Sequence, residues 1–159
     1  MGKKSTNKYH VIEKITFDEI LPIWREYLWP NRQSDIDPNS AMCFLGGYDL
    51  ANMDYEPTFF AYMIDGHIAG VNSGHMCKDQ SYRSRGLYVF EEYRGRGIAT
   101  ELLKATIEQG RIEGAVLSWS YPRQSSWKSY SIFCFIYQLS YTPSRMDVPS
   151  RSPNCSSYV

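Results

Sequence analysis

The glycine-rich turn at residues 94–97 carries the clearest chemical signal in this sequence of 159 residues. It follows the apolar run 87–90 and opens a segment of helical periodicity that continues to about Glu113. Main-chain N–H groups at such a turn converge on an anion, and the unpaired N–H groups and dipole of a first helical turn favour negative charge there. The pattern therefore predicts a pyrophosphate site, with an ordinary tight connection between a strand and a helix as the alternative.

The spacing of the glycines excludes two other phosphate-binding motifs. A Walker A loop requires G-x-x-x-x-G-K followed by S or T, and no stretch of the sequence has that spacing. A dinucleotide-binding turn requires G-x-G-x-x-G, and Thr100 occupies the position of the third glycine. The pattern that remains is Arg94-x-x-Gly97-x-Ala99.

This pattern resembles the Q/R-x-x-G-x-G/A acyl-CoA motif of the GNAT superfamily of N-acetyltransferases. Residues 87–89 are similar to the cofactor-pairing strand of that family. Residues 126–130, with Phe135 after them, resemble its late helix, which ends in Y-x-x-x-G-F. The similarity runs from about Tyr82 to Phe135, roughly a third of the chain.

The resemblance implies a mixed α/β domain over residues 1–140, with a splayed, mostly antiparallel sheet flanked by helices. It also implies acetyl-CoA as cofactor, direct attack by an amine, pantetheine on strand 87–89 and pyrophosphate on residues 94–100. A main-chain N–H near Val89 would hold the thioester carbonyl and stabilise the developing oxyanion. The implied cofactor-binding residues are Leu87, Tyr88, Val89, Arg94, Gly95, Arg96, Gly97, Ile98, Ala99 and Thr100.

Tyr130 is the catalytic residue that the resemblance implies, because a Tyr at this place in the family often protonates the departing thiolate. A phenol with a pKa of about 10 is a reasonable acid for a basic thiolate, and a Tyr packed against the core is the alternative. The sequence identifies no general base, although His75 lies near the end of an expected strand, and Ser118 and Ser120 alternate along another. No Ser–His–Asp or Cys–His arrangement is readable, so nucleophilic hydrolysis is not expected.

Acceptor specificity in the family usually comes from the first helices and their loop. The acceptor-binding residues expected on this basis are Trp29, Arg32, Ser120 and Tyr121, near the aromatic residues Trp24, Tyr27 and Trp127. These aromatic side chains either line a pocket for a flat or apolar group or belong to the core. The expected acceptor is a small-molecule or peptide amine.

The composition restricts the other functions. Lys and Arg together number 17, as do Asp and Glu, so the formal net charge is zero and argues against a general nucleic-acid binder. The four cysteines are widely spaced without a C-x-x-C pair, so no metal site is expected and free thiols in the cytoplasm are the simplest interpretation. No apolar run approaches the roughly 18 residues of a membrane span, so no membrane insertion is expected.

Periodicity and turn residues place the elements around these sites. Thr16 and Glu19 form a capping-box pattern for a helix to about Trp29, which Pro22 either kinks or starts later. Asp65-Gly66 predicts a tight hairpin turn. The expected strands are 9–12, 58–64, 67–75, 81–90, 115–120 and 132–139, and the other expected helices are a short one near 40–43, the long one after the glycine turn, and a short one carrying Trp127 and Tyr130.

The C-terminal part departs from the family pattern in two ways. Cys134 replaces the usual glycine before Phe135, and that glycine often permits a bulge. Beyond Ser140 the sequence is rich in Ser, Pro and Arg without a clear final strand, so residues 141–159 are expected to form a mostly disordered tail. A non-catalytic acyl-CoA-binding or interaction module is therefore an alternative function, and acetylation of a nucleobase or nucleic acid is a third.

Overall fold

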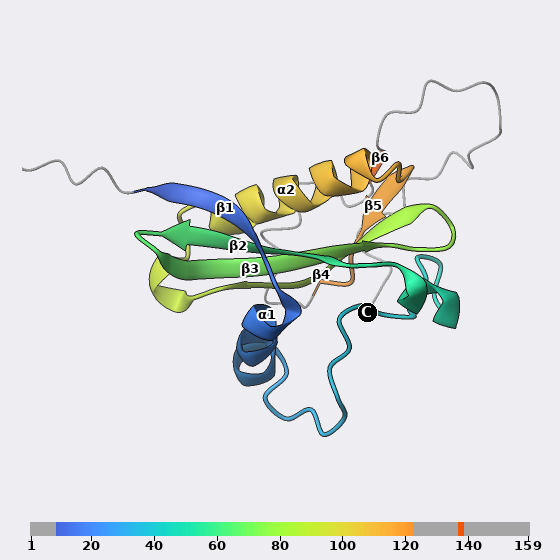
Figure 1. Cartoon of the computed structure of the whole chain (residues 1–159), viewed down its shortest axis with the longest axis horizontal. Coiled ribbons are helices and arrows are strands. Elements are labelled where there is room, and N and C mark those ends of the chain that lie inside the picture. Colours follow the sequence, from blue (N-terminus) through green and yellow to red (C-terminus); the bar gives the residue numbers. More distant parts are fainter. Residues whose placement is uncertain (1–8, 123–136, 139–159) are drawn as a thin grey trace, which may run out of the picture.

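In the part of the chain that the structure describes, six strands form one sheet whose spatial order follows the sequence, β1-β2-β3-β4-β5-β6 (Figure 1). The computed structural model describes residues 9–122 and 137–138. Neighbouring strands are antiparallel except β4 and β5, which are parallel. The strands are β1 (His10–Ile15), β2 (Thr58–Ile64), β3 (His67–Met76), β4 (Ser81–Val89), β5 (Leu117–Trp119) and β6 (Tyr137–Gln138).

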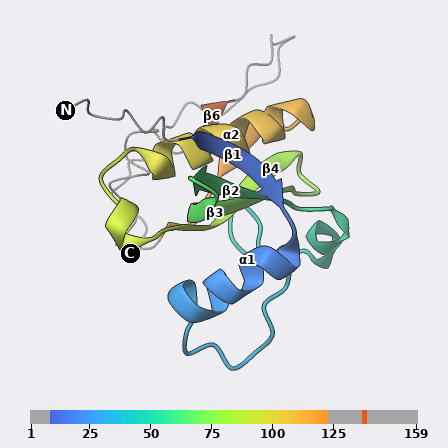
Figure 2. The ribbon, with the colours of Figure 1, turned by 60° about the vertical axis from the view of Figure 1, so that its left-hand side comes forward.

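Helices cover both faces of this sheet. The long helix α2 (Ile98–Ile112) crosses one face, and α1 (Phe17–Ile23) lies on the other, followed by the π-helix η1 (Trp24–Leu28) (Figure 2). Two short 3-10 helices, η2 (Leu50–Asp54) and η3 (Glu91–Tyr93), lie in connections. The predicted mixed α/β fold, with a mostly antiparallel sheet flanked by helices, is confirmed.

The first helix begins at its predicted capping box. The Glu19 N–H donates to Thr16 Oγ1 at 3.3 Å, and the Thr16 N–H donates to the Glu19 carboxylate at 2.7 Å. Pro22 lies inside α1, so the helix does not begin at this residue. Proline has no N–H to donate to the preceding turn. Shortly after it the chain adopts the wider π-helical turn of η1, in which the Trp29 N–H donates to the Trp24 carbonyl at 2.8 Å.

A buried polar network and an apolar stripe fix α2 over the sheet. Asn72 of β3 donates to Ser84 Oγ of β4 at 2.9 Å and to Thr106 Oγ1 of α2 at 2.8 Å, and all three side chains are buried. Because each member has a partner, the network adds specificity without leaving a polar group unsatisfied. The apolar cluster around it consists of Phe60, Ile64, Ala69, Leu87, Ile98, Leu102 and Leu103.

The hairpin turn predicted at Asp65-Gly66 is confirmed, and a second glycine turn ends α2. Asp65 and Gly66 have φ values of 49° and 80°, the left-handed pair that a type I′ hairpin turn requires. Gly114 has a φ of 85° directly after the C-cap of α2, and its N–H donates to the Arg111 carbonyl at 3.1 Å. Both turns follow from the conformational freedom of glycine at positive φ.

The predicted short helix near residues 40–43 is wrong. This stretch is not helical, and Met42 forms an isolated antiparallel bridge with Tyr48. Gly46 and Gly47, with φ values of 92° and 76°, turn the chain back between the two bridged residues. Helical spacing over so few residues is weak evidence, and the glycine pair favours the reversal.

Candidate functional site

The strands β4 and β5 are paired at one end only. The parallel register joins residues 81–83 to Leu117–Trp119. β4 continues to Val89, and in the described part of the chain no strand pairs with residues 84–89 on the side of β5. β5 is shorter than the predicted strand 115–120, and the sheet opens beyond it. This is the splayed geometry expected of strand 87–89.

A β-bulge lies where β4 loses its partner. The register with β3 shifts by one residue between Val71 and Ser73, so that Gly86 and Leu87 together oppose a single residue of β3. The extra residue changes the alternation of side chains along the strand. Arg85 packs against the aromatic rings on the α1 face, whereas Leu87 packs under α2.

Trp24 holds the bulge in place from the α1 face. Its indole Nε1 donates to the Gly86 carbonyl at 2.9 Å, and Trp24 is fully buried. Gly86 has a φ of 77°, and a Cβ built at this position would overlap the indole ring. The bulge therefore requires glycine for two separate reasons, its backbone conformation and the contact with Trp24.

The end of β4 turns a main-chain amide toward the open edge. The Phe90 N–H donates to the Ala69 carbonyl of β3 at 3.0 Å. Because successive strand residues present their main-chain groups to opposite sides, the N–H and carbonyl of Val89 point away from β3. The Val89 carbonyl accepts a hydrogen bond from Arg94 Nε at 3.0 Å on that edge. The Val89 N–H lies at the position where an oxyanion donor was expected.

The glycine turn that follows leaves its amides open. Gly95 and Gly97 have φ values of 74° and 79°, and a Cβ built at either residue meets nothing within 4 Å. Gly97 is the N-cap of α2, with no side-chain cap. Among the described residues, the N–H groups of positions 95–100 donate no hydrogen bond, and the next one, of Glu101, donates to the Gly97 carbonyl at 3.1 Å. Consecutive free donors at a helix N-terminus suit a pyrophosphate.

The two arginine side chains of the turn do not cover these amides. The Arg94 guanidinium carbon lies 5.7 Å from the centre of the Tyr88 ring, in addition to the hydrogen bond to β4. Arg96 Nη2 donates to the Glu92 carbonyl at 3.0 Å, and its guanidinium carbon lies 5.5 Å from the centre of the Tyr93 ring. Both side chains fold back onto β4 and η3, so the anion site that the turn offers is formed by main-chain groups.

Two of the expected acceptor residues lie together on the α1 face. The guanidinium carbons of Arg32 and Arg85 lie 5.9 Å and 5.1 Å from the centre of the Trp29 ring. Trp29 packs edge to face on Trp24, with ring centres 5.3 Å apart. Trp24 is therefore a core residue, whereas Trp29 is half-buried and contacts both guanidinium groups.

The other two expected acceptor residues lie beyond β5. Tyr121 is 47% exposed, and its ring centre lies 5.4 Å from that of Trp119. Its hydroxyl donates a hydrogen bond to the Phe44 carbonyl at 3.3 Å. Ser120, between the two aromatic residues, is half-buried. Ser118 Oγ is buried and has no hydrogen-bond partner in the part of the chain that the structure describes.

Gly86, Arg83 and Arg85 were not predicted as site residues. All three precede the cofactor-pairing strand that the family resemblance identified. A glycine inside a strand pattern indicates a bulge, and this signal was present at position 86. The alternating arginines at 83 and 85 were a second signal, because two charged side chains on one face of a central strand need a reason to be there.

His75 is buried and does not reach a cleft. Its Nδ1 lies 2.9 Å from the Met76 carbonyl, so the neutral ring carries its proton on Nδ1 and leaves Nε2 as an acceptor. Nε2 is buried without a partner among residues 9–122 and 137–138. Burial, together with the charges of Arg83 and Arg85, lowers the pKa of His75 to about 4. A fully buried ring gives His75 no access to a substrate amine, so the geometry does not support it as the general base.

The buried His75 predicts that the protein loses stability in mild acid. As pH falls, the unfolded chain binds a proton near the ordinary pKa of 6.5, whereas the folded chain binds it only near 4. The free energy of unfolding therefore decreases through this window, by about 3 kcal/mol in full. Urea unfolding at several pH values should show this decrease, and His75→Gln should reduce it. His67→Asn, at an exposed histidine, is the matched control; equal pH dependence in both variants would contradict the assignment.

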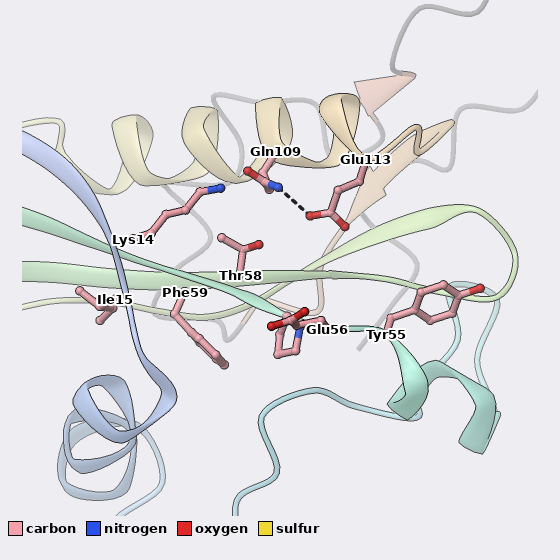
Figure 3. A pocket seen from close by; sticks show the side chains of 9 residues that line it. Lys14, Ile15, Tyr55, Glu56, Thr58, Phe59, Gln109 and Glu113 are labelled. Carbon is pink, nitrogen blue, oxygen red and sulfur yellow. Dashed lines mark hydrogen bonds between the residues drawn. The ribbon is translucent and has the colours of Figure 1, made fainter.

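A cavity formed by described residues lies away from this corner. It has a volume of about 490 Å³ and is lined by side chains from β1, β2 and the C-terminal turn of α2, including Lys14, Thr58, Gln109 and Glu113 (Figure 3). The glycine turn lies at the opposite end of α2. Among the described residues no group of His, Cys, Asp or Glu side chains could hold a metal ion, and no helix is long and apolar enough to cross a bilayer.

Several predicted features lie outside the described residues. These are Tyr130, the helix with Trp127, the substitution Cys134, and the tail 141–159. Of the predicted strand 132–139, only Tyr137–Gln138 is described, as β6 beside β5. The expected donor of the thiolate proton therefore stays a prediction.

Solved structures share this fold at low sequence identity. A GNAT-family acetyltransferase from Staphylococcus aureus Mu50 is 13% identical over 79% of this chain and 82% of that chain, with a TM-score of 0.57. The aminoglycoside N-acetyltransferase AAC(6')-Iy, bound to a bisubstrate analogue, is 20% identical over 90% of this chain and 97% of that chain, with a TM-score of 0.56. A GNAT-family acetyltransferase from Brucella melitensis, in complex with acetyl-CoA, is 15% identical over 77% of this chain and 81% of that chain, with a TM-score of 0.53.

No curated protein matches the sequence. A family model described as the acetyltransferase (GNAT) family matches residues 17–133, which include α1, the whole of β2 to β5, the bulge and the glycine turn. Splayed strands, an open turn and this match all concern the same residues. The chain therefore belongs to the GNAT family of acetyltransferases.

Proposed function

We propose that this protein is an N-acetyltransferase that transfers an acetyl group from acetyl-CoA to an amine by direct attack in a ternary complex. The observation that carries the proposal is the corner formed by the open end of β4 and the uncapped amides of positions 95–100. These groups fit the cosubstrate because free N–H groups suit its pyrophosphate and an unpaired strand edge suits its amide-containing arm. When bound, acetyl-CoA supplies an activated thioester.

The chain itself contributes position and electrostatics. The turn and the first turn of α2 hold the diphosphate, which fixes the register of the arm along β4. The Val89 N–H, directed away from β3, would donate to the acetyl oxygen as negative charge develops there. Arg94 contributes indirectly, because its hydrogen bond to the Val89 carbonyl fixes the end of the strand and the beginning of the turn together.

Tyr130 is the proposed general acid for the thiolate. The support is the family resemblance at positions 126–130, together with the suitability of a phenol for a basic leaving group. Tyr130→Phe should lower kcat by about tenfold or more, because the missing proton donor affects only the chemical step. The affinity for acetyl-CoA, measured by calorimetry, should stay within about twofold of the parent protein. An unchanged kcat would remove Tyr130 from the mechanism.

The proposed acceptor is a small-molecule amine. One structural neighbour is an aminoglycoside N-acetyltransferase, which supports a small molecule over a macromolecule. The acceptor would reach the thioester from the α1 face, where Trp29 and Arg32 lie. The free thiols of Cys43 and Cys77 support a reducing compartment, and we place the reaction in the cytoplasm.

Two measurements together test the proposal. Calorimetric titration with acetyl-CoA tests binding, and release of free thiol with a panel of primary amines tests turnover. The proposal predicts both binding and amine-dependent thiol release. Binding without thiol release from any amine would favour a non-catalytic acyl-CoA-binding module, and no binding at millimolar acetyl-CoA would remove both interpretations.

A further inference from the structure

Two arginines on the α1 face carry charge that the described protein does not neutralise. Arg85 is only 8% exposed, and its Nη1 donates to the main-chain carbonyls of Asp37 at 2.6 Å and Asn39 at 3.1 Å. Its Nε and Nη2 donate to nothing in the described residues. Burial, with the charges of Arg83 and Arg32, lowers the pKa of Arg85 to about 10, so that the guanidinium stays cationic at neutral pH.

No carboxylate forms an ion pair with Arg85 or Arg32 within residues 9–122 and 137–138. Asp37 is the nearest candidate, since its charge raises the pKa of Arg85, but its side chain is exposed and its contact with Arg85 is through the main chain. Buried charges in proteins are normally paired with an opposite charge. The Nε and Nη2 of Arg85 are not among the fully buried atoms without a partner, so a ligand that carries an anion can reach them.

The two arginines also share one aromatic platform. Both guanidinium carbons lie within 6 Å of the centre of the Trp29 ring, and that of Arg85 also lies 5.0 Å from the centre of the Trp24 ring. A guanidinium held against an aromatic ring by a cation–π contact still has N–H groups that can make a bidentate contact with an oxyanion. Arg32 is exposed, with Nε bonded to Ser34 Oγ at 3.0 Å, so the pair combines one buried and one accessible cation.

The position along β4 connects this pair to the proposed chemistry. Arg85 directly precedes the Gly86 bulge, and Val89 lies four residues further on the same strand, at most about 13 Å of extended chain. An acceptor whose amine lies beside Val89 would therefore extend toward Arg85 and Arg32. The fit is to a molecule with several bonds between its amine and its anionic group.

We propose that the acceptor is an amine that also carries an oxyanion, a carboxylate or a phosphate, which Arg85 and Arg32 bind beside Trp29. This inference rests on the proposed function, because that function places the acceptor's amine beside Val89. It adds the chemical class of the acceptor. A polyamine would place further positive charge beside Arg85 and Arg32, so we expect it to bind least well.

The test compares matched amines for binding and for turnover. The panel contains ω-amino acids of short and long chain, their neutral amides, amine phosphates of matched length, and spermidine. Binding is measured by calorimetry with and without saturating CoA, and turnover by thiol release from acetyl-CoA. The expected result is about tenfold or greater preference in Kd and KM for an anionic amine over its neutral amide, with spermidine weakest. Comparing carboxylates with phosphates identifies the oxyanion.

Substitutions of the arginines distinguish binding of the oxyanion from a purely structural role. Arg32→Gln should remove most of the preference for anionic amines, about tenfold, and leave the Kd for CoA unchanged. Arg25→Gln, the same charge change at an exposed arginine of η1, is the matched control and should keep the preference. Arg85→Lys keeps the charge but loses the planar fork, and should weaken the oxyanion contact by a similar factor.

The outcomes separate this inference from the proposed function. Neutral amides or spermidine binding as well as anionic amines, or equal behaviour of Arg32→Gln and Arg25→Gln, would overturn the inference while acetyl-CoA turnover stands. If the protein fails to bind CoA, the proposed function falls. The titrations of anionic amines without CoA then still decide whether Arg85 and Arg32 form an oxyanion site.

Discussion

Replacing Gly86 by alanine is expected to lower the free energy of unfolding by about 2–5 kcal/mol. Two causes add at this position. A residue with a Cβ at a φ of 77° is strained by about 1–2 kcal/mol, and the Cβ overlaps the buried Trp24 indole, which cannot move without disturbing the α1 face. Chemical denaturation of both proteins, with acetyl-CoA absent, measures the difference directly.

Gly114→Ala is the matched control for this prediction. Gly114 has a φ of 85°, but a Cβ built there meets nothing within 4 Å. Gly114→Ala should therefore lower the free energy of unfolding only by the cost of the strained backbone conformation, about 1–2 kcal/mol. If the two alanine variants lose the same stability, the contact between Trp24 and the bulge does not contribute as described, and the bulge is held by glycine conformation alone.

Gly95→Asp is expected to weaken acetyl-CoA binding by about a hundredfold relative to Gly95→Asn. The two side chains have the same shape and meet the same positive φ, which Asn and Asp both tolerate better than other residues. They differ in one negative charge placed beside the open amides. A like charge about 5 Å from a diphosphate, near a protein surface, is unfavourable by roughly 3 kcal/mol.

The same pair of substitutions at Gly66 controls for general effects of charge. Gly66 has a φ of 80°, lies in the β2–β3 turn, and has open space around a built Cβ. Gly66→Asp and Gly66→Asn should bind acetyl-CoA with equal Kd in calorimetric titrations. Equal Kd values for Gly95→Asp and Gly95→Asn would show that no diphosphate lies beside Gly95, whatever the absolute affinity.

The features that the sequence predicted best depend on local residue types. The capping box at Thr16 and Glu19, the Asp65-Gly66 turn and the glycine end of α2 each involve neighbours in the chain, and all are present. The ion pair between Lys104 and Glu101 on the exposed face of α2, at 2.9 Å, also joins residues three apart in the chain. Such features follow from short-range chemistry, so a single sequence suffices.

The features that were missed depend on residues far apart in the chain. Gly86 requires glycine because Trp24, 62 positions earlier, occupies the space over it. Arg85 is buried because the loop carbonyls of Asp37 and Asn39 and the ring of Trp29 cover it. No periodicity within β4 records these contacts. The role of an isolated glycine or a buried arginine becomes visible only when the partner segment is placed.

The measurement closest to the central claim is the shift of backbone amide NMR signals during titration with acetyl-CoA. The largest shifts are expected for the amides of residues 95–100 and for the open edge of β4 up to Val89. Inorganic pyrophosphate should shift the first group and leave the β4 edge nearly unchanged. Shifts confined to the cavity around Lys14 and Glu113, or none at millimolar acetyl-CoA, would contradict the account.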